Sequence, residues 1–414
     1  MRAGPKVLPF YLTLSLTISG LDGAVTDPVG YIDNWLVAGK KGSLPLPLAH
    51  AYTKLDDVVA SGVSAPGESF VEYSTDLPGD LLGPSGSACL DIRSGAGSGQ
   101  SLRVTGFSGR RVMFEGSPMF EIEPGTKVGV RPNWSLGALF GSPPTADILQ
   151  GDSVEEADVI GLQDPATQTT REFFFKSGEG WREVGHEEEG DRSATAVPYR
   201  SAVQFFRRTA PDLSFVQVGT VPMYDSPQHW VKVWPGRNLL TTPFSPAKKI
   251  GELLVPASLV SGGSAPHSDS FRVVSEDAEL SPIIYHHQSR GWTSVGGGAT
   301  PAAETPFDLY TVLDFQRVGE VGFLRFNTDF LSNQSVSGRL SVAEQVVPID
   351  PELSDFTSQR LGWRSEPGAT YQVQVRPLES SLWNDLGAPV VADGEVTLAR
   401  CAPEGRGIFR IVVR

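Results

Sequence analysis

Apolar and polar residues alternate along many short stretches of the chain. "SLRVTGF" (101–107), "RRVMFEG" (110–116) and "MFEIEPG" (119–125) place an apolar side chain at every second position. The same period of two recurs near the C-terminus, at 361–363, 371–375 and 409–413. Because successive side chains of a strand point to opposite faces, this period predicts half-buried β-strands. We expect an all-β protein made of many short strands.

One phrase occurs twice, as "GWREVG" at 180–185 and as "GWTSVG" at 291–296. A shift of 111 residues without gaps aligns 146–185 with 257–296, and eight of the 40 aligned pairs are identical. Chance gives about two or three identities at ordinary residue frequencies. The pattern therefore predicts an internal duplication. The identical pairs are Ala146/Ala257, Gly151/Gly262, Ser153/Ser264, Asp158/Asp269, Gly180/Gly291, Trp181/Trp292, Val184/Val295 and Gly185/Gly296.

Each copy predicts the same β-hairpin. A short apolar run, "DVIGL" or "DSFRV", leads through a polar turn to "EFFFKSGEGW" or "IIYHHQSRGW". Aromatic and β-branched residues favour strands, and the glycines of "SGEG" and "QSRG" permit tight turns. Trp181 and Trp292 then open the return strands. We expect both indoles to pack in the core or against the hairpin, with contact to a ligand as the alternative. Trp35, Trp230 and Trp234 are freer to lie at the surface.

The chain divides into five segments on these patterns. We expect a signal peptide at 1–24 and a first β-rich unit at 25–225, enlarged by an insertion at about 66–142. A second unit at 226–335 repeats the first, because "VKVWPGRNLLTTPF" (231–244) echoes "WLVAGKKGSLPLPL" (35–48). The segment at 336–355 has the composition of a linker. A small β-sandwich module is expected at 356–414. The fold expected is duplicated sandwich-like or barrel-like units followed by this module.

The first residues resemble a secretory signal. Arg2 and Lys6 precede an apolar stretch at 7–20 that is too short to span a bilayer, and small residues follow up to Ala24. We expect cleavage after Ala24 and export to the periplasm, the outer surface or the medium. No second stretch of about 18 apolar residues occurs in the sequence, so no membrane span is expected after the signal is removed.

Two resemblances follow from these motifs. "TDPVGYI" (26–32), "RPNWSLGALFG" (131–141), the stretches around Asp158 and Asp269 and the paired "GWxxVG" phrases resemble an uncharacterised family of exported proteins, which occurs as many paralogues in verrucomicrobial bacteria. The resemblance covers about 26–331. Family members carry tyrosine-rich strands before "GW", where this chain has "FFF" (173–175) and "YHH" (285–287). The resemblance implies export and assigns no activity or catalytic residue.

The second resemblance concerns the C-terminal segment. "LGWRSEPGATYQVQVRPLESSLWNDLG" is similar to a β-sandwich module at the ends of many large exported proteins of the same bacteria. It implies an accessory or display domain without known chemistry. The matching residues are Trp363, Gly368, Tyr371, Val373, Gln374, Trp383, Leu386, Gly387, Phe409 and Arg410.

Composition narrows the class of partner. The formal net charge is −14 and the pI is about 4.9, so phosphate backbones are repelled and nucleic acid is not an expected partner. Charged residues make up 20% and hydrophobic residues 40%, which is typical of a globular chain. The 45 glycines and 32 prolines suit many turns rather than long helices.

The sequence offers few candidates for metal chemistry. His286 and His287 are adjacent, and adjacent strand residues point to opposite faces, which makes a shared ion difficult. The acidic run "HEEEGD" (186–191) lacks the alternating spacing of a calcium loop and is more typical of a solvated loop. We assign no metal ligand and no cofactor.

Motifs for covalent catalysis are also missing from the sequence. There is no GxSxG, no dinucleotide-binding GxGxxG turn and no P-loop, and "GPSGS" (83–87) and "GAGSGQ" (95–100) are glycine-serine loops. Cys89 and Cys401 are the only cysteines, and they could pair in an oxidising compartment if the first and last domains touch. No catalytic residue is assigned, and a non-enzymatic protein is expected.

Three functions stay open. The first is an exported non-enzymatic protein with a structural, adhesive or display role at the cell envelope or outside the cell. The second is a carbohydrate-binding protein for polysaccharide or envelope glycans. The third is a hydrolase without a local signature, since two carboxylates at a suitable separation are enough for glycoside hydrolysis. The expected partner is a cell-surface glycan or an envelope protein, and the sequence leaves the oligomeric state open.

Overall fold

A computed structural model describes most of the chain. The described residues are 29–144, 147–209, 211–220, 222, 224–226, 228–242, 248–274, 280–296, 302–307, 312–327, 360–364, 368–377, 383–392, 396–400 and 407–413. The predicted signal peptide at 1–24, the predicted linker at 336–355 and Cys401 lie outside the described residues.

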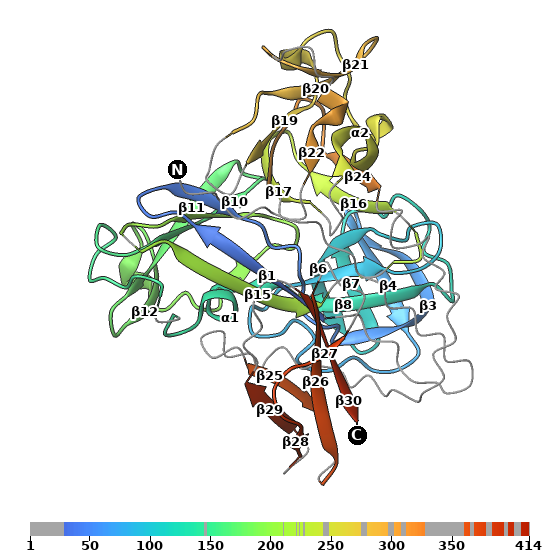
Figure 1. The fold of residues 1–414 in the computed structure, drawn as a ribbon. Helices are drawn as coiled ribbons and strands as arrows, with labels where there is room; N and C mark the ends of the chain where they lie inside the picture. Colours follow the sequence, from blue (N-terminus) through green and yellow to red (C-terminus); the bar gives the residue numbers. More distant parts are fainter. Residues whose placement is uncertain are drawn as a thin grey trace.

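The prediction of an all-β protein is confirmed. Strands dominate the described chain, and its two α-helices, α1 (Leu136–Phe140) and α2 (Ile250–Leu253), have five and four residues. No helix in the described part is long and apolar enough to cross a membrane. Figure 1 shows a first unit mostly in green with β1 in dark blue, a barrel in blue to cyan, a second unit in yellow and orange, and C-terminal strands in red.

The barrel closes in the strand order β3-β4-β7-β6-β5-β8. Buried and accessible positions alternate in β4, β6 and β7, as the period of two predicts. Its six strands cover 54–132, whereas the insertion was expected at about 66–142. Its bounds are β3 (Lys54–Ala65), β4 (Glu68–Tyr73), β5 (Ala88–Ile92), β6 (Ser101–Ser108), β7 (Arg111–Glu115) and β8 (Lys127–Pro132).

One expected strand is absent from the barrel. The stretch 119–125 forms bends and a turn between β7 and β8, so the prediction of a strand there is wrong. Met119 and Phe120 are exposed and only Ile122 enters the barrel core. Pro124 and Gly125 form the turn, and Gly125 has a φ of 86°, so the alternating letters reflect one buried side chain in a loop.

The first unit surrounds the barrel in sequence. Its five-stranded sheet has the order β12-β11-β10-β14-β2, and β1 pairs with β15 beside it. Its elements are β1 (Val29–Leu36), β2 (Lys41–Leu44), β9 (Trp134–Ser135), α1, β10 (Val159–Asp164), β11 (Thr169–Lys176), β12 (Gly180–Glu183), η1 (Glu187–Glu189), β13 (Ala196–Val197), β14 (Val203–Phe206) and β15 (Leu213–Thr220).

The second unit follows without an inserted barrel. Its five-stranded sheet has the order β17-β23-β19-β20-β21, and β16 pairs with β24. Its elements are β16 (Gln228–Val233), β17 (Gly236–Thr241), β18 (Lys248–Lys249), α2, η2 (Pro256–Ser258), η3 (Ala265–His267), β19 (Ser270–Val274), β20 (Ile284–His287), β21 (Gly291–Ser294), η4 (Ala302–Glu304), β22 (Pro306–Phe307), β23 (Val312–Arg317) and β24 (Gly322–Asn327).

The two units share strand order and register. Phe175 faces Trp181 across the first hairpin and His286 faces Trp292 across the second, which is the same pairing at an offset of 111 residues. Gly180 and Gly291 both take positive φ, at 102° and 72°, as the turn chemistry predicts. The predicted hairpins are therefore confirmed in both units.

A buried aspartate makes the same contacts in each unit. Asp158 Oδ2 accepts hydrogen bonds from the amide of Leu149 (2.9 Å) and from Arg207 Nη1 (2.5 Å), and its Oδ1 accepts from the amide of Arg208 (2.9 Å). Asp269 repeats this set, with Oδ2 accepting from the amide of Val260 (2.9 Å) and from Arg317 Nη1. Its Oδ1 accepts from the amide of Val318 (3.0 Å). Each aspartate ties a loop to the end of the central strand pair.

The two repeated tryptophans differ in burial. Trp181 is fully buried between Phe140 and Phe175, and its Nε1 donates to the carbonyl of Gly141 at 2.8 Å. The core role expected for Trp181 is confirmed. Trp292 packs on Phe271 and His286 but stays half-buried, so the second indole contributes less to its core.

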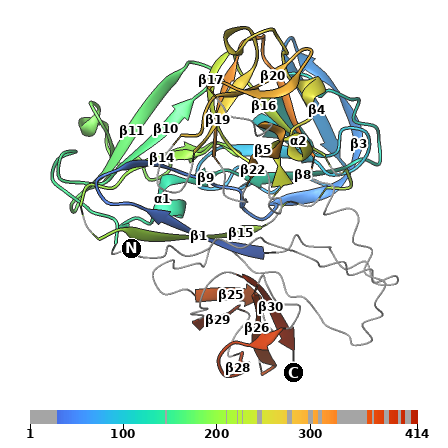
Figure 2. The ribbon, with the colours of Figure 1, turned by 45° about the horizontal axis from the view of Figure 1, so that its top comes forward.

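The C-terminal strands join the first unit through one strand. β30 pairs with β26 along its length and meets β1 at Gly30 and Ile408, giving the sheet order β15-β1-β30-β26-β27. Figure 2 shows these strands next to β1 and β15, away from the second unit. Their bounds are β25 (Arg360–Arg364), β26 (Thr370–Pro377), β27 (Asn384–Asp385), β28 (Val390–Val391), β29 (Val396–Arg400) and β30 (Gly407–Val413).

Truncating the two repeated indoles should have unequal effects. Trp181→Ala removes a fully buried ring and should lower the free energy of unfolding by about 3–5 kcal/mol. Trp292→Ala removes a half-buried ring and should lower it by at most about 2 kcal/mol. Chemical denaturation of both variants measures the difference. Equal losses would show that the burial of the two rings does not decide their contribution.

Breaking either buried aspartate–arginine pair should be costly. Asp158→Asn or Asp269→Asn leaves a guanidinium without its carboxylate and should cost about 3–5 kcal/mol of stability. Glu172→Gln, which breaks an exposed ion pair with Lys41, is the matched control and should cost under about 1 kcal/mol. A similar small loss in all three variants, measured by urea unfolding, would contradict the structural role of the buried pairs.

Candidate functional site

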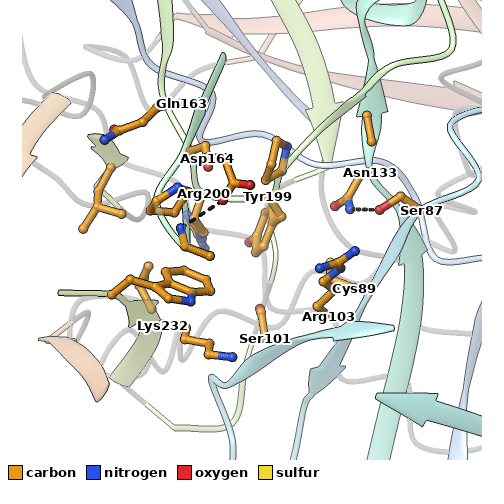
Figure 3. Close-up of a pocket in the computed structure, with 18 of the residues that line it drawn as sticks. Ser87, Cys89, Ser101, Arg103, Asn133, Gln163, Asp164, Tyr199, Arg200 and Lys232 are labelled. Carbon is orange, nitrogen blue, oxygen red and sulfur yellow. Dashed lines mark hydrogen bonds between the residues drawn. The ribbon is translucent and has the colours of Figure 1, made fainter. Parts of the chain in front are cut away.

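A cavity of about 390 Å³ lies where the barrel meets both units, and we call it the junction cavity. The barrel side contributes β5, β6 and β7, the first unit contributes the end of β10 and the segment 196–201, and the second unit contributes β16 and β17. Figure 3 shows Tyr199, Arg200, Ser101, Arg103 and Lys232 around it. Its lining also includes Ser87, Cys89, Glu115, Asn133, Gln163, Asp164, Arg171, Trp230 and Trp234.

The two units are held together along the edge of β17. Gln163 Nε2 donates to the carbonyl of Arg237 (2.9 Å), and Gln163 Oε1 accepts from the amide of Leu239 (2.9 Å). The backbone of 200–202 then pairs with the same strand, because the amide of Thr241 donates to the carbonyl of Arg200 at 2.9 Å. These bonds, two from the Gln163 side chain and one between main-chain groups, fix one wall of the junction cavity.

The barrel meets the second unit through the loop "GAGSGQ" (95–100). The amide of Trp230 donates to the carbonyl of Gly99 at 2.9 Å, and the amide of Ser226 donates to Ser98 Oγ at 3.1 Å. A Cβ on Gly99 would lie 1.8 Å from the carbonyl oxygen of Gln228, and its φ is 92°, so only glycine fits this approach. The glycine-serine loop is thus a contact between the barrel and the second unit.

The strand β5, which contributes Ala88 and Cys89 to the lining, also carries one partner of a buried ion pair. Arg131 and Asp91 are both fully buried, with Arg131 Nε at 2.5 Å from Asp91 Oδ2. The centre of the Tyr52 ring lies 4.0 Å from Arg131 Cζ, and the Tyr52 hydroxyl donates a hydrogen bond to Asp91 Oδ2 at 3.0 Å. Burial opposes the charge on Arg131, but Asp91 beside it raises its pKa above the ordinary value. The two charges cancel inside the junction.

Arg200 is a second buried guanidinium at this junction, with a different environment. It is 4% exposed and its Nη2 lies 3.0 Å from His229 Nδ1, while its Cζ lies 4.6 Å from the centre of the Tyr199 ring. Among the described residues Arg200 has no carboxylate within 4.0 Å, and its Nη1 has no hydrogen-bond partner. Its φ is 67°, which is unusual for a residue with a side chain.

Burial also sets the protonation of the neighbouring rings. It lowers the pKa of His229 well below the ordinary value of 6.5, and Arg200 adds to this effect, so the imidazole is neutral and accepts the hydrogen bond. Burial raises the pKa of Tyr199 well above 10.0 and that of Tyr224 to about 12. The hydroxyl groups therefore stay protonated at neutral pH and can donate hydrogen bonds.

Further charged side chains at the lining are already engaged by other groups of the chain. Lys232 Nζ lies 2.8 Å from Glu115 Oε1 and stacks on the Trp234 ring at 5.0 Å. Arg171, which also lines the cavity, forms an ion pair at 2.5 Å with Glu183, which does not. Asp164 Oδ1 accepts from the amide of Ala166 at 2.9 Å. The carboxylates at the lining, Glu115 and Asp164, are thus already engaged by chain groups.

The histidine pair and the acidic run lie away from this cavity. His286 Nδ1 bonds the hydroxyl of Ser261 at 2.9 Å, whereas His287 Nδ1 accepts from the amide of Ser289 at 3.1 Å, so the two rings face different partners. In the acidic run, Asp191 Oδ1 accepts from the amide of Trp181 at 2.9 Å and caps the hairpin. Within the described part of the chain, no three side chains of His, Cys, Asp or Glu are arranged to hold a metal ion.

Two residues noted in the sequence belong to the cavity in unexpected ways. Trp230 is 8% exposed, because the barrel loop and Arg325 cover it, so the expectation of a surface indole is wrong. Trp234 is half-buried at the lining.

The predicted pairing of Cys89 with Cys401 stays a prediction, because Cys401 lies outside the described residues. Burial, reinforced by Asp91, raises the pKa of Cys89 well above 9.0 and keeps it a thiol.

The comparisons with known proteins place the chain in no family: no family model, curated protein or solved structure matches it.

No signal in the sequence marks Arg200, Tyr199, Asn133 or the Asp91–Arg131 pair as part of a site. These residues are spread from 91 to 200 and carry no shared spacing. The one local feature that includes any of them is "RPNW" (131–134), which contains Arg131 and Asn133 and belongs to a motif noted only for its resemblance.

Stability should fall on mild acidification because of His229. The folded state holds its pKa below 6.5, so the unfolded state binds the proton first as the pH drops below about 6.5. One such group lowers the free energy of unfolding by at most about 1.4 kcal/mol per pH unit. His229→Gln keeps an acceptor for Arg200 and should flatten the dependence between pH 7 and 5.5, measured by urea unfolding. An unchanged slope would contradict the buried neutral imidazole.

Proposed function

We propose that the protein is an exported, non-enzymatic binding protein that holds a carbohydrate in the junction cavity. This is the carbohydrate-binding function expected as an alternative from the sequence, and it gives the adhesive or display role a physical basis. The volume of about 390 Å³ falls in the range of about 300–1,000 Å³ typical of ligand pockets.

The lining carries the proposal. Sugars present apolar C–H faces and many hydroxyl groups, so they bind where aromatic faces lie next to hydrogen-bonding side chains. The junction cavity offers the rings of Trp230, Trp234 and Tyr199. Asn133 Nδ2 donates to Ser87 Oγ at 2.8 Å (Figure 3), while Asn133 Oδ1 is buried without a partner among the described residues. An unpaired buried acceptor is costly, and a ligand hydroxyl would satisfy it.

Binding without hydrolysis fits the carboxylates at the lining better than catalysis does. Glu115 is held in an ion pair by Lys232, and Asp164 is held by the amide of Ala166. Glycoside hydrolysis needs one carboxyl group as an acid and a second as a base or nucleophile. The engagement of both groups with the chain supports a binding role.

Export and duplication are part of the same proposal. The apolar segment at 7–20 supports export. The common strand order, the common register and the repeated aspartate contacts support an origin of both units by duplication. The barrel then provides the wall that turns two similar units into a closed site.

Binding to a glycan panel followed by titration tests the proposal. The full exported chain should bind at least one glycan, and Trp234→Ala should weaken that binding by about tenfold or more. The variant should keep the unfolding midpoint of the wild type, because Asn238 holds the backbone of Trp234 through its own side chain (2.9 and 2.7 Å).

Trp292→Ala is the matched control for this titration. It also removes a half-buried indole, but one outside the cavity lining, and it should keep the affinity of the wild type. Absence of binding to every glycan at millimolar concentration, or equal affinity of the wild type and Trp234→Ala, would overturn the proposal.

A further inference from the structure

Four arginines are buried in the described part of the chain, and three of them form an ion pair with a carboxylate. Arg131 pairs with Asp91, Arg207 with Asp158 and Arg182 with Glu179. Arg200 is the exception, with only the neutral His229 ring and the face of Tyr199 beside it. A buried guanidinium without a carboxylate is unfavourable unless another anion completes its environment.

The unpaired groups of Arg200 and Tyr199 belong to the same wall of the junction cavity. Arg200 Nη1 and Tyr199 Oη are both buried and have no hydrogen-bond partner among the described residues. Both residues line the cavity, and the guanidinium carbon lies 4.6 Å from the centre of the Tyr199 ring. Because the hydroxyl is protonated, the two groups are donors, and donors of this kind are satisfied by an oxyanion with two or more oxygens.

We infer that the junction cavity contains an oxyanion subsite, in which Arg200 and Tyr199 bind the carboxylate or sulfate group of an acidic sugar. The inference rests on the proposed carbohydrate-binding function and names the class of sugar. Arg103, whose side chain is 76% exposed, also lies at the lining, where its Nη1 is 3.9 Å from Glu115 Oε2. The net charge of −14 repels polyanions at long range, so the subsite suits a sugar with an isolated charge.

Main-chain hydrogen bonds hold Arg200 in an unusual backbone conformation. Arg200 and Gln168 are the only non-glycine residues with positive φ among those described. The carbonyl of Arg200 is fixed by the amide of Thr241, and the amide of Ser201 donates to the carbonyl of Pro198 at 3.1 Å. This turn delivers the side chain into the junction, where conformations of this kind are maintained by their surroundings.

Calorimetric titration of the full chain with four probes tests the inference. Glucuronate and glucose 6-sulfate carry the two oxyanions, glucose is the neutral match, and sodium sulfate is the free anion. The wild type should bind at least one acidic sugar roughly tenfold or more tightly than glucose, as a charge-assisted hydrogen bond provides. Whichever acidic sugar binds more tightly identifies the oxyanion.

Two variants assign the preference to the subsite. Arg200→Gln should abolish the preference for the acidic sugar and leave the affinity for glucose within about twofold. Tyr199→Phe keeps the ring and should reduce the preference in part, which keeps the test valid if Arg200→Gln fails to fold. Arg103→Gln, at the exposed edge of the lining, is the control and should retain the preference.

The outcomes separate the inference from the function on which it rests. Glucose binding with no preference for either acidic sugar, or a preference that survives Arg200→Gln, overturns the subsite and leaves carbohydrate binding intact. Binding of sulfate that depends on Arg200, without binding of any sugar, upholds the subsite and overturns carbohydrate binding. Failure of all four probes and of the glycan panel overturns both.

Discussion

The structure depends on the need of buried arginines for oxygen acceptors. A guanidinium removed from water is tolerated only when carboxylates and carbonyls replace the lost hydration. Arg207 meets this need with Asp158 and the carbonyl of Asp147, and Arg317 meets it with Asp269 and the carbonyl of Ser258. In each unit the pair fastens the loop before the central strand to the end of its neighbour. The same ion pair therefore fixes the equivalent point of the sheet in both units.

At the junction of the lobes the same requirement links the fold to the site. Arg131 comes from the end of β8 and finds Asp91 on β5, so the pair belongs to the barrel, while its Nη1 reaches towards Thr220 of the first unit (3.4 Å). Main-chain bonds from β17 and from Gly99 then bring the second unit against both. The junction cavity is the space that these separately fixed walls enclose, and Arg200 lies in the wall without a carboxylate of its own.

The sequence predicts strands and hairpins formed by neighbouring residues, but not the contacts between the barrel and the two units. Alternation identified β6 and β7, and the turn glycines identified the hairpins that contain Trp181 and Trp292. The same alternation failed at 119–125, because it cannot separate a strand from a loop with one buried side chain. Burial of Trp230 also could not be predicted, since the residues that cover it come from the barrel loop and from β24. The candidate site combines residues from 87 to 240, and no spacing in the chain marks them.

The two units share residues of the scaffold and differ at the junction cavity. The aspartates, the hairpin glycines and the tryptophans are identical in both units at the same offset. The residues of the junction cavity are different: Gln163, which fixes β17, corresponds to Val274, and neither Tyr310 nor Thr311, at the offsets that match Arg200, is basic. If the cavity were a by-product of the repeated fold, each unit would carry the same lining. Because the first unit and the second unit contribute unlike residues to one shared lining, and the barrel adds a third wall, the cavity depends on the barrel and not on the similarity of the two units alone.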